Sequence, residues 1–212
     1  MLWLRADKGV TGAPVTAWAD QSAAADANRN ATAAGALRPT FNPSNAAFNG
    51  QPTIDFSAAM QLVTGVWSVA PTQPFTYFIV AKDNTAGTGN IYFCDSISGG
   101  QCALISASGQ TEWLCGGAFG GGGHATLAAC VQIAIFGATP NDAFNQKTLQ
   151  ASTSPGAGSF TGMSIGNYQG GGAPFAGTSI AELVVYQGAI SPGDAAKLET
   201  YAGARYGIAI GA

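Results

Sequence analysis

The stretch Ile180-Ala-Glu-Leu-Val-Val-Tyr-Gln-Gly-Ala-Ile-Ser-Pro-Gly-Asp-Ala-Ala-Lys-Leu-Glu-Thr-Tyr-Ala-Gly-Ala-Arg-Tyr-Gly207 decides the fold. Its first seven residues are apolar except for one acid, Glu182, and they predict a buried strand that ends at Tyr186. Ser191 has the side chain that caps a helix by accepting a backbone N–H bond. Gly207 suits the left-handed residue that ends a helix. The stretch therefore predicts one strand followed by one short α-helix.

Short β-rich runs separated by Gly, Pro, Asn and Asp recur through the rest of the chain, and this spacing predicts a sandwich of many strands. The predicted strands are Thr16–Ala19, Thr53–Phe56, Phe75–Lys82, Ile91–Cys94, Cys102–Ser106, Thr111–Cys115, Cys130–Phe136, Gly162–Gly166 and Ser179–Tyr186. Ala23–Ala36 has little periodicity and predicts a long surface loop, and Gly116–Gly123 predicts a mobile hairpin tip or a contact surface.

Three motifs accompany the C-terminal stretch. They are Trp18-Ala-Asp20-Gln-Ser22, Asn49-Gly50-Gln51-Pro52 with Ile54-Asp55-Phe56, and the run Phe75 to Lys82. Together they resemble the laminin-G-like branch of concanavalin A-like jelly rolls. The resemblance implies an all-β, antiparallel two-sheet β-sandwich with one short C-terminal α-helix, which we expect to form a lid over one end. We expect a single domain over residues 1–212, since all-β sandwiches of this length are commonly undivided.

Charged residues are sparse. They make up 9% of the 212 residues, against roughly 25% in an average globular protein. The surface is then mostly small, neutral and polar, which favours self-association and suits a subunit packed among neighbours. The eight Lys and Arg are scattered rather than clustered, so we expect no nucleic-acid binding. No apolar run reaches the 18 residues or so that a membrane span requires, so we expect no membrane insertion.

Four cysteines fall in or beside predicted strands. Cys94 and Cys102 bracket a short Ser-Gly-Gly turn, whereas Cys115 and Cys130 bracket a longer glycine-rich loop, so either pair of hairpin neighbours is placed to form a disulfide. Free buried thiols are the favoured alternative, because Cys often behaves as a small hydrophobic residue and the chain shows no export signal.

The acids argue against catalysis. Glycosidases need two carboxyl groups that face one cleft, and Glu112, Glu182 and Glu199 each lack a second acid within four residues. We therefore expect no catalytic residues and no enzyme activity. Glu182 stands in an apolar strand, so it predicts a buried carboxyl group that bonds to backbone or to Arg205. A structural role is expected for Glu182, Arg205 and Trp18.

Aromatic residues in or beside loops are the side chains that sugar recognition would use, because pyranose faces stack on rings while nearby polar groups contact hydroxyls. The candidate ligand-binding residues are Trp113, Phe119, His124, Asn167 and Tyr168. A role in the core or in an interface is the competing interpretation of the same residues.

Metal binding has one candidate. Asp20 and Asp26, with Ser22 and Asn28, offer oxygen atoms on one stretch of chain, and calcium takes six to eight oxygen ligands. Turn formation, in which Asp20 and Ser22 bond to backbone groups, is the favoured alternative. No other cofactor is expected.

The resemblance also implies a function. Chains with this C-terminal pattern are often encoded by tailed bacteriophages, which implies a non-enzymatic subunit of the virion surface, as a capsid decoration protein or a tail or fibre component. The expected partners are capsid or tail subunits, further copies of the chain and cell-surface glycans, with assembly in the host cytoplasm. The alternative is a carbohydrate-binding module or lectin of a bacterial surface or secreted protein, outside the cell.

Overall fold

The computed structural model of this protein describes residues 1–24, 26–85, 90–95, 102–107, 110–115, 118–123, 127–137, 142–145, 148–152, 158–167 and 175–210. One α-helix, α1 (Pro192–Tyr206), and three short 3₁₀ helices, η1 (Ala27–Arg29), η2 (Gly35–Leu37) and η3 (Ala46–Phe48), accompany two sheets. The strands of the first sheet are β1 (Leu2–Arg5), β5 (Thr40–Asn42), β6 (Thr53–Ala58), β8 (Phe75–Asp83), β13 (Cys130–Phe136), β14 (Asp142–Asn145), β15 (Thr148–Ser152) and β17 (Phe175–Gln187). Those of the second are β2 (Val10–Thr11), β3 (Ala17–Trp18), β4 (Ala31–Thr32), β7 (Leu62–Val63), β9 (Asn90–Asp95), β10 (Cys102–Ala107), β11 (Gln110–Cys115), β12 (Ala118–Gly123) and β16 (Met163–Ile165).

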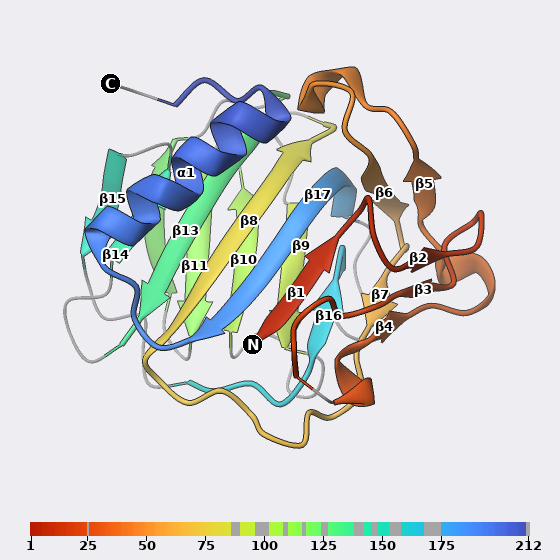
Figure 1. Cartoon of the computed structure of the whole chain (residues 1–212), viewed down its shortest axis with the longest axis horizontal. Coiled ribbons are helices and arrows are strands. Elements are labelled where there is room, and N and C mark those ends of the chain that lie inside the picture. The colour runs from red at the N-terminus through yellow and green to blue at the C-terminus, as the bar shows by residue number, and fades with distance from the viewer. Residues whose placement is uncertain are drawn as a thin grey trace.

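The two sheets stack as a sandwich (Figure 1). In the described residues the first is eight-stranded, ordered β15-β14-β13-β8-β17-β6-β5, with β1 also paired to β17. The second is nine-stranded, ordered β12-β11-β10-β9-β16-β7-β4-β3-β2. Within the described residues, all the strand pairings that form these sheets are antiparallel. This confirms the predicted all-β, antiparallel two-sheet sandwich with a C-terminal helix.

The centre of the eight-stranded sheet is buried on both faces. In β8 every residue except Lys82 is buried, which explains why this strand reads as an unbroken apolar run rather than an alternating one. Tyr77 and Ile79 belong to the core between the sheets, whereas Phe78 and Val80 belong to a second cluster on the outer face. That outer face needs a cover, and the only described α-helix supplies it.

Helix α1 begins and ends as the sequence predicts. The Ser191 hydroxyl accepts a hydrogen bond from the backbone N–H of Asp194 (3.1 Å), and Gly207 ends the helix with φ of 69°. The expectation that the helix covers one end of the sandwich is wrong. Instead it lies across the outer face of the eight-stranded sheet (Figure 1), where Ala202 and Tyr206 pack with the outer-face side chains of β8 and β13. The apolar outer face of those strands explains this position.

A β-bulge in β17 changes which way the strand points its side chains. Ile180 pairs with Ala81 of β8, but Glu182 pairs with Val80, so Ala181 is an extra residue. Ile180 lies in the core between the sheets, whereas Ala181 lies in the cluster under α1. Without the bulge, Glu182 would share the core-facing side with Ile180. The bulge directs the Glu182 side chain toward the helix.

Two predicted loops are wrong in part. Ala23–Ala36 contains η1, β4 and the start of η2, and both Arg29 and Ala31 within it are buried. Ala118–Gly123, in the stretch predicted as a mobile hairpin tip, forms β12 and pairs with β11. Strand pairing uses backbone groups, so a glycine-rich strand at the edge of a sheet gives little side-chain pattern to detect.

The cysteines divide into two kinds. Cys102 is disulfide-bonded, so the free state favoured for it is wrong. Cys130 is free and buried, which excludes the predicted pairing of Cys115 with Cys130. The strand register sets Cys102 level with Cys115 on β11 and sets Cys94 level with Ala103.

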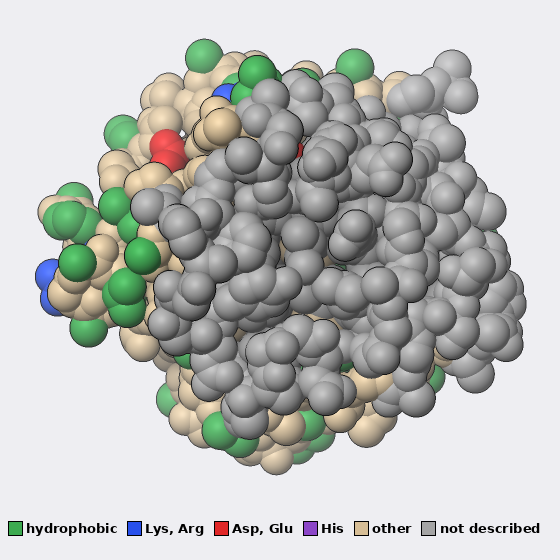
Figure 2. Space-filling model, turned by 180° about the vertical axis from the view of Figure 1, so that it is seen from behind, with side chains coloured by type: hydrophobic (Ala, Val, Ile, Leu, Met, Phe, Trp, Pro, Cys, Tyr) green, Lys and Arg blue, Asp and Glu red, His purple; other side chains and the backbone are tan. Residues whose placement is uncertain are grey.

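On the face opposite to that of Figure 1, the described side chains lie around the margin, and those coloured in Figure 2 are mostly apolar or neutral polar with a few Lys, Arg, Asp and Glu between them. In the described residues no helix is long and apolar enough to cross a bilayer.

Candidate functional site

A groove of about 390 Å³ opens on the outer face of the eight-stranded sheet, beside α1. We call it the α1 groove, and it is lined by Met1, Trp3, Arg5, Phe78, Glu182, Val184, Leu198 and Tyr201. In Figure 1 this region lies where β8 and β17 pass between α1 and β1 without a helix over them. Its volume falls within the roughly 300 to 1,000 Å³ of small-molecule sites.

Strand pairing places the groove residues of the sheet. In β1, Trp3 lies opposite Val184 and Arg5 lies opposite Glu182. On the other side of β17, Val184 lies opposite Phe78 of β8. Residues directly opposite each other share a face of the sheet, so Trp3, Val184 and Phe78 form one row across three strands. Helix α1 contributes Leu198 and Tyr201 as the facing wall.

Glu182 joins the two walls of the groove. Its side chain is 2% exposed. One carboxyl oxygen accepts a hydrogen bond from the Trp3 indole N–H (2.6 Å), and the other accepts from the hydroxyls of Tyr201 (2.9 Å) and Tyr206 (2.8 Å). Burial, followed by the negative charge of Glu182, raises the pKa of both tyrosines, so both keep their protons and stay donors.

A second set of charges lies next to this carboxyl group. Asp7 accepts two hydrogen bonds from Arg5, at 2.6 and 2.8 Å, and one from Arg205 at 2.7 Å. The prediction that Arg205 is the partner of Glu182 is therefore wrong, because the carboxyl group of Glu182 accepts its hydrogen bonds from two tyrosines and a tryptophan. Partial burial opposes ionisation of Asp7, but hydrogen bonds from Arg5 and the charge of Arg205 outweigh it and lower the Asp7 pKa below its usual 3.8.

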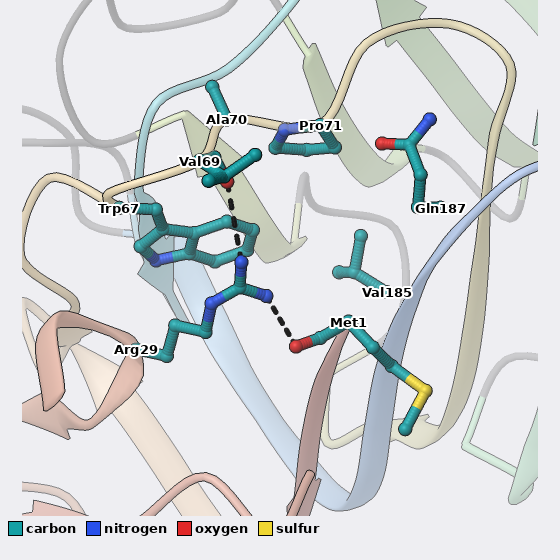
Figure 3. A pocket seen from close by; sticks show the side chains of 8 residues that line it. All are labelled: Met1, Arg29, Trp67, Val69, Ala70, Pro71, Val185 and Gln187. Carbon is teal, nitrogen blue, oxygen red and sulfur yellow. Dashed lines mark hydrogen bonds between the residues drawn. The ribbon is translucent and has the colours of Figure 1, made fainter. Parts of the chain in front are cut away.

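A smaller pocket of about 80 Å³ lies at the edge of the sandwich near Met1 (Figure 3). Arg29 dominates it: the guanidinium lies 4.8 Å from the ring centre of Trp67, donates to the backbone carbonyls of Met1 and Val69, and approaches Asp26 at 3.5 Å. These contacts use the guanidinium within the protein. We therefore assign the arrangement to packing and not to ligand binding.

The predicted metal residues engage protein donors. Asp20 accepts hydrogen bonds from the backbone N–H groups of Trp3 (2.8 Å) and Ser22 (2.9 Å). Asp26 accepts from the backbone N–H and the hydroxyl of Ser68, both at 2.9 Å. Among the described residues no group of three or more His, Cys, Asp or Glu could hold a metal ion. This geometry matches the turn interpretation, and calcium binding stays a prediction.

Of the five predicted ligand-binding residues, the structure describes the side chain of one. The side chains of Trp113, Phe119, His124 and Tyr168 lie outside the described residues, although the strand register sets Trp113 level with Phe119. Asn167 is described and fully buried, which keeps its side chain from a ligand at the surface. A sugar site built from these residues stays a prediction.

Trp18, predicted to be structural, is fully buried and donates its indole N–H to the carbonyl of Arg5 (2.9 Å).

The sequence alone did not identify four of the groove residues as members of a site, namely Trp3, Arg5, Leu198 and Tyr201. Trp3 and Arg5 alternate with Leu2 and Leu4, and this period of two was the available signal that they share one face of a strand.

No family model matches this chain, and no curated protein matches it. Solved structures with similar folds exist. The chain resembles Trypanosoma rangeli sialidase in complex with sialic acid, with a TM-score of 0.65 and 13% identity, over 93% of this chain and 32% of the sialidase chain.

Neurotoxin structures are similar too. A structure of botulinum neurotoxin type C, a toxin whose cell entry depends upon interaction with two ganglioside molecules, gives a TM-score of 0.70 and 9% identity over 95% of this chain and 51% of that one. The binding domain of botulinum neurotoxin serotype D/C gives 0.69 and 9% over the same shares. The chain therefore spans about a third of the sialidase and half of the toxin chains, and the similarity establishes the sandwich fold alone.

We predict that Glu182→Ala destabilises the protein by on the order of 3 kcal/mol, because each buried donor left without an acceptor costs about 1–3 kcal/mol. Tyr206→Phe, which removes a donor buried at 2% exposure, should cost more than Tyr201→Phe at the half-buried position. Urea unfolding followed by circular dichroism measures the three values. A Glu182→Ala variant as stable as the wild type would contradict the structural role of this acid.

We predict that Asp7 makes the unfolding free energy depend on pH in the acidic range. Its pKa is lower in the folded protein, so the stabilisation is present above its usual pKa of 3.8 and is lost as the pH falls through the folded value. The unfolding free energy of the wild type should therefore decline below about pH 4 more steeply than that of Asp7→Asn. Denaturant titrations between pH 2 and pH 7 test this, and parallel curves would refute it.

Proposed function

We propose that the chain is a non-enzymatic, glycan-binding β-sandwich whose sugar site is the α1 groove. The observation that carries this proposal is the groove itself, in which the rings of Trp3 and Tyr201 line a space of small-molecule size at the protein surface. Pyranose rings bind aromatic side chains through their apolar faces while neighbouring polar groups contact the hydroxyls. The fold shared with a ganglioside-dependent toxin supports this proposal by analogy.

The acids favour binding over hydrolysis. Among the residues that line the groove, Glu182 is the acid. Both of its oxygens already accept hydrogen bonds from side chains, and the two-carboxylate mechanism common among glycosidases would need a second carboxyl group facing it across the cleft. Asp7, the other described acid nearby, is bonded to Arg5 and Arg205. Neither of these two acids is therefore free to act as the proton donor or the nucleophile of such a mechanism.

We predict that a glycan array detects at least one sugar and that Trp3→Ala weakens its binding by about tenfold or more, since a lost stacking surface of about 1.4 kcal/mol corresponds to that factor. Trp3→Phe keeps a ring but loses the bond to Glu182, so it should retain most of the affinity. Tyr186→Ala is the matched control, because Tyr186 is an aromatic residue of β17 with 46% exposure that does not line the groove. An array without any binding at millimolar glycan would end the proposal.

We further propose that the chain serves at the surface of a tailed-bacteriophage virion, as a capsid decoration protein or a tail or fibre component. A surface with few charges supports this, because it repels copies of itself weakly and suits a packed subunit. Its partners would be capsid or tail subunits and further copies of the chain. The alternative is a lectin or carbohydrate-binding module of a bacterial surface or secreted protein.

The two locations predict different assemblies. For a virion subunit, light scattering after gel filtration should show a homo-oligomer, and mass spectrometry should find the chain in purified phage particles from the source culture. Its interfaces should exceed about 1,000 Å². A monomer found only on cells or in the medium would instead support the lectin alternative.

A further inference from the structure

We infer that the α1 groove selects uncharged, ring-sized ligands and excludes ionised ones. This deepens the proposed function, because it assigns the groove to a neutral ring of the ligand, either a sugar ring or an apolar ring attached to it. The inference depends on the chemistry of the groove, and it can be tested without any glycan.

The groove offers mainly apolar surface. Phe78 and Val184 lie side by side on β8 and β17, and Trp3 continues their row onto β1. Leu198 and Tyr201 line it from α1. A planar or chair-shaped ring placed between these walls would bury apolar atoms on both of its sides, which stabilises the complex by roughly 25 cal/mol for each Å² removed from water.

The acid in the groove is poorly accessible to a cationic ligand, because it is almost fully buried and three of its about four acceptor positions are occupied. Glu182 is 2% exposed, and its two oxygens accept three hydrogen bonds, from Trp3, Tyr201 and Tyr206. A ligand ammonium group would therefore reach this carboxyl group only if the donors around it moved apart. Any donor that lost its bond to Glu182 in that movement would cost free energy, most of all the buried hydroxyl of Tyr206.

The cation in the groove is engaged as well. Arg5 donates two parallel hydrogen bonds to Asp7, the bidentate geometry that makes arginine–carboxylate pairs strong. Arg205 reaches the same carboxyl group at 2.7 Å. An anionic ligand would compete with Asp7 for Arg5, and the side chain of Asp7 would repel it. The positive charges of Arg5 and Arg205 are therefore balanced by the negative charges of Asp7 and Glu182.

Because Glu182 and Arg5 already bind partners within the protein, an ionised ligand group would lose its water in this groove without gaining either of them as a partner. Transfer of an unpaired ion out of water is strongly unfavourable. A neutral ring avoids that cost, so two ligands of the same shape that differ in one ionised group should differ clearly in affinity.

Two fluorescent probes provide such a pair. N-phenyl-1-naphthylamine is neutral, and 8-anilino-1-naphthalenesulfonate has the same ring framework with one sulfonate added. We expect the neutral probe to bind the folded protein at least about tenfold more tightly, with energy transfer from tryptophan. Equal or tighter binding of the sulfonate would overturn the inference.

A charge placed in the groove wall locates the binding. Leu198→Lys should weaken the neutral probe and strengthen the sulfonate, because the new ammonium group would face the groove. Thr200→Lys is the matched control, since it adds the same charge to α1 at an exposed position that does not line the groove. Circular dichroism confirms that both variants fold. If neither probe responds to Leu198→Lys, or if both variants respond alike, the probes bind elsewhere and the inference is overturned.

The outcome also separates this inference from the proposed function. Selective uptake of the neutral probe together with an empty glycan array would leave the inference standing and remove the glycan proposal. Trp3-dependent binding of sialylated glycans, with an affinity equal to that of their neutral counterparts, would support the glycan proposal and overturn the inference.

Discussion

The buried carboxyl group of Glu182 is the constraint on which the outer half of this structure depends. A carboxyl group at 2% exposure is stable only if its oxygens are hydrogen-bonded. The donors come from two elements that are remote in sequence, Trp3 of β1 and two tyrosines of α1, and they meet on β17. One acid thus fixes the first strand and the last helix relative to the centre of the sheet. The α1 groove is the space left between the elements that it holds.

The bulge in β17 makes this arrangement possible. The strand must fill the core with Ile180 and Leu183 and also direct an acid to the opposite face. With regular alternation the side chain of Glu182 would point into the apolar core between the sheets, away from Trp3, Tyr201 and Tyr206. One extra residue, Ala181, resolves the conflict, and its backbone carbonyl accepts a hydrogen bond from Ala6 N–H (2.9 Å). The small side chain of Ala181 also fits beneath the helix.

The sequence predicted those features that depend on local chemistry. The apolar run of β8 and the caps of α1 at Ser191 and Gly207 indicate their own structures, and the structure confirms them. The partners of Glu182 could not be predicted, because a bulge changes the face of a strand without a change in apolar pattern, and because Trp3 lies 179 residues away. The glycine-rich strand β12 was missed because its pairing uses backbone groups. The place of α1 on the sheet depended on the outer face of β8, which a period-two interpretation of that strand does not reveal.

The same contacts that stabilise the structure also limit its chemistry. A carboxyl group can donate a proton or attack a sugar only if an oxygen is free to approach the substrate, and the oxygens of Glu182 are held by an indole and two phenols. Asp7 is similarly held by Arg5 and Arg205. The charges of Glu182, Asp7, Arg5 and Arg205 are therefore paired inside the protein, and the surface that the groove presents is mainly apolar. On the function proposed above, shape and apolar contact would be the means of recognising a ligand.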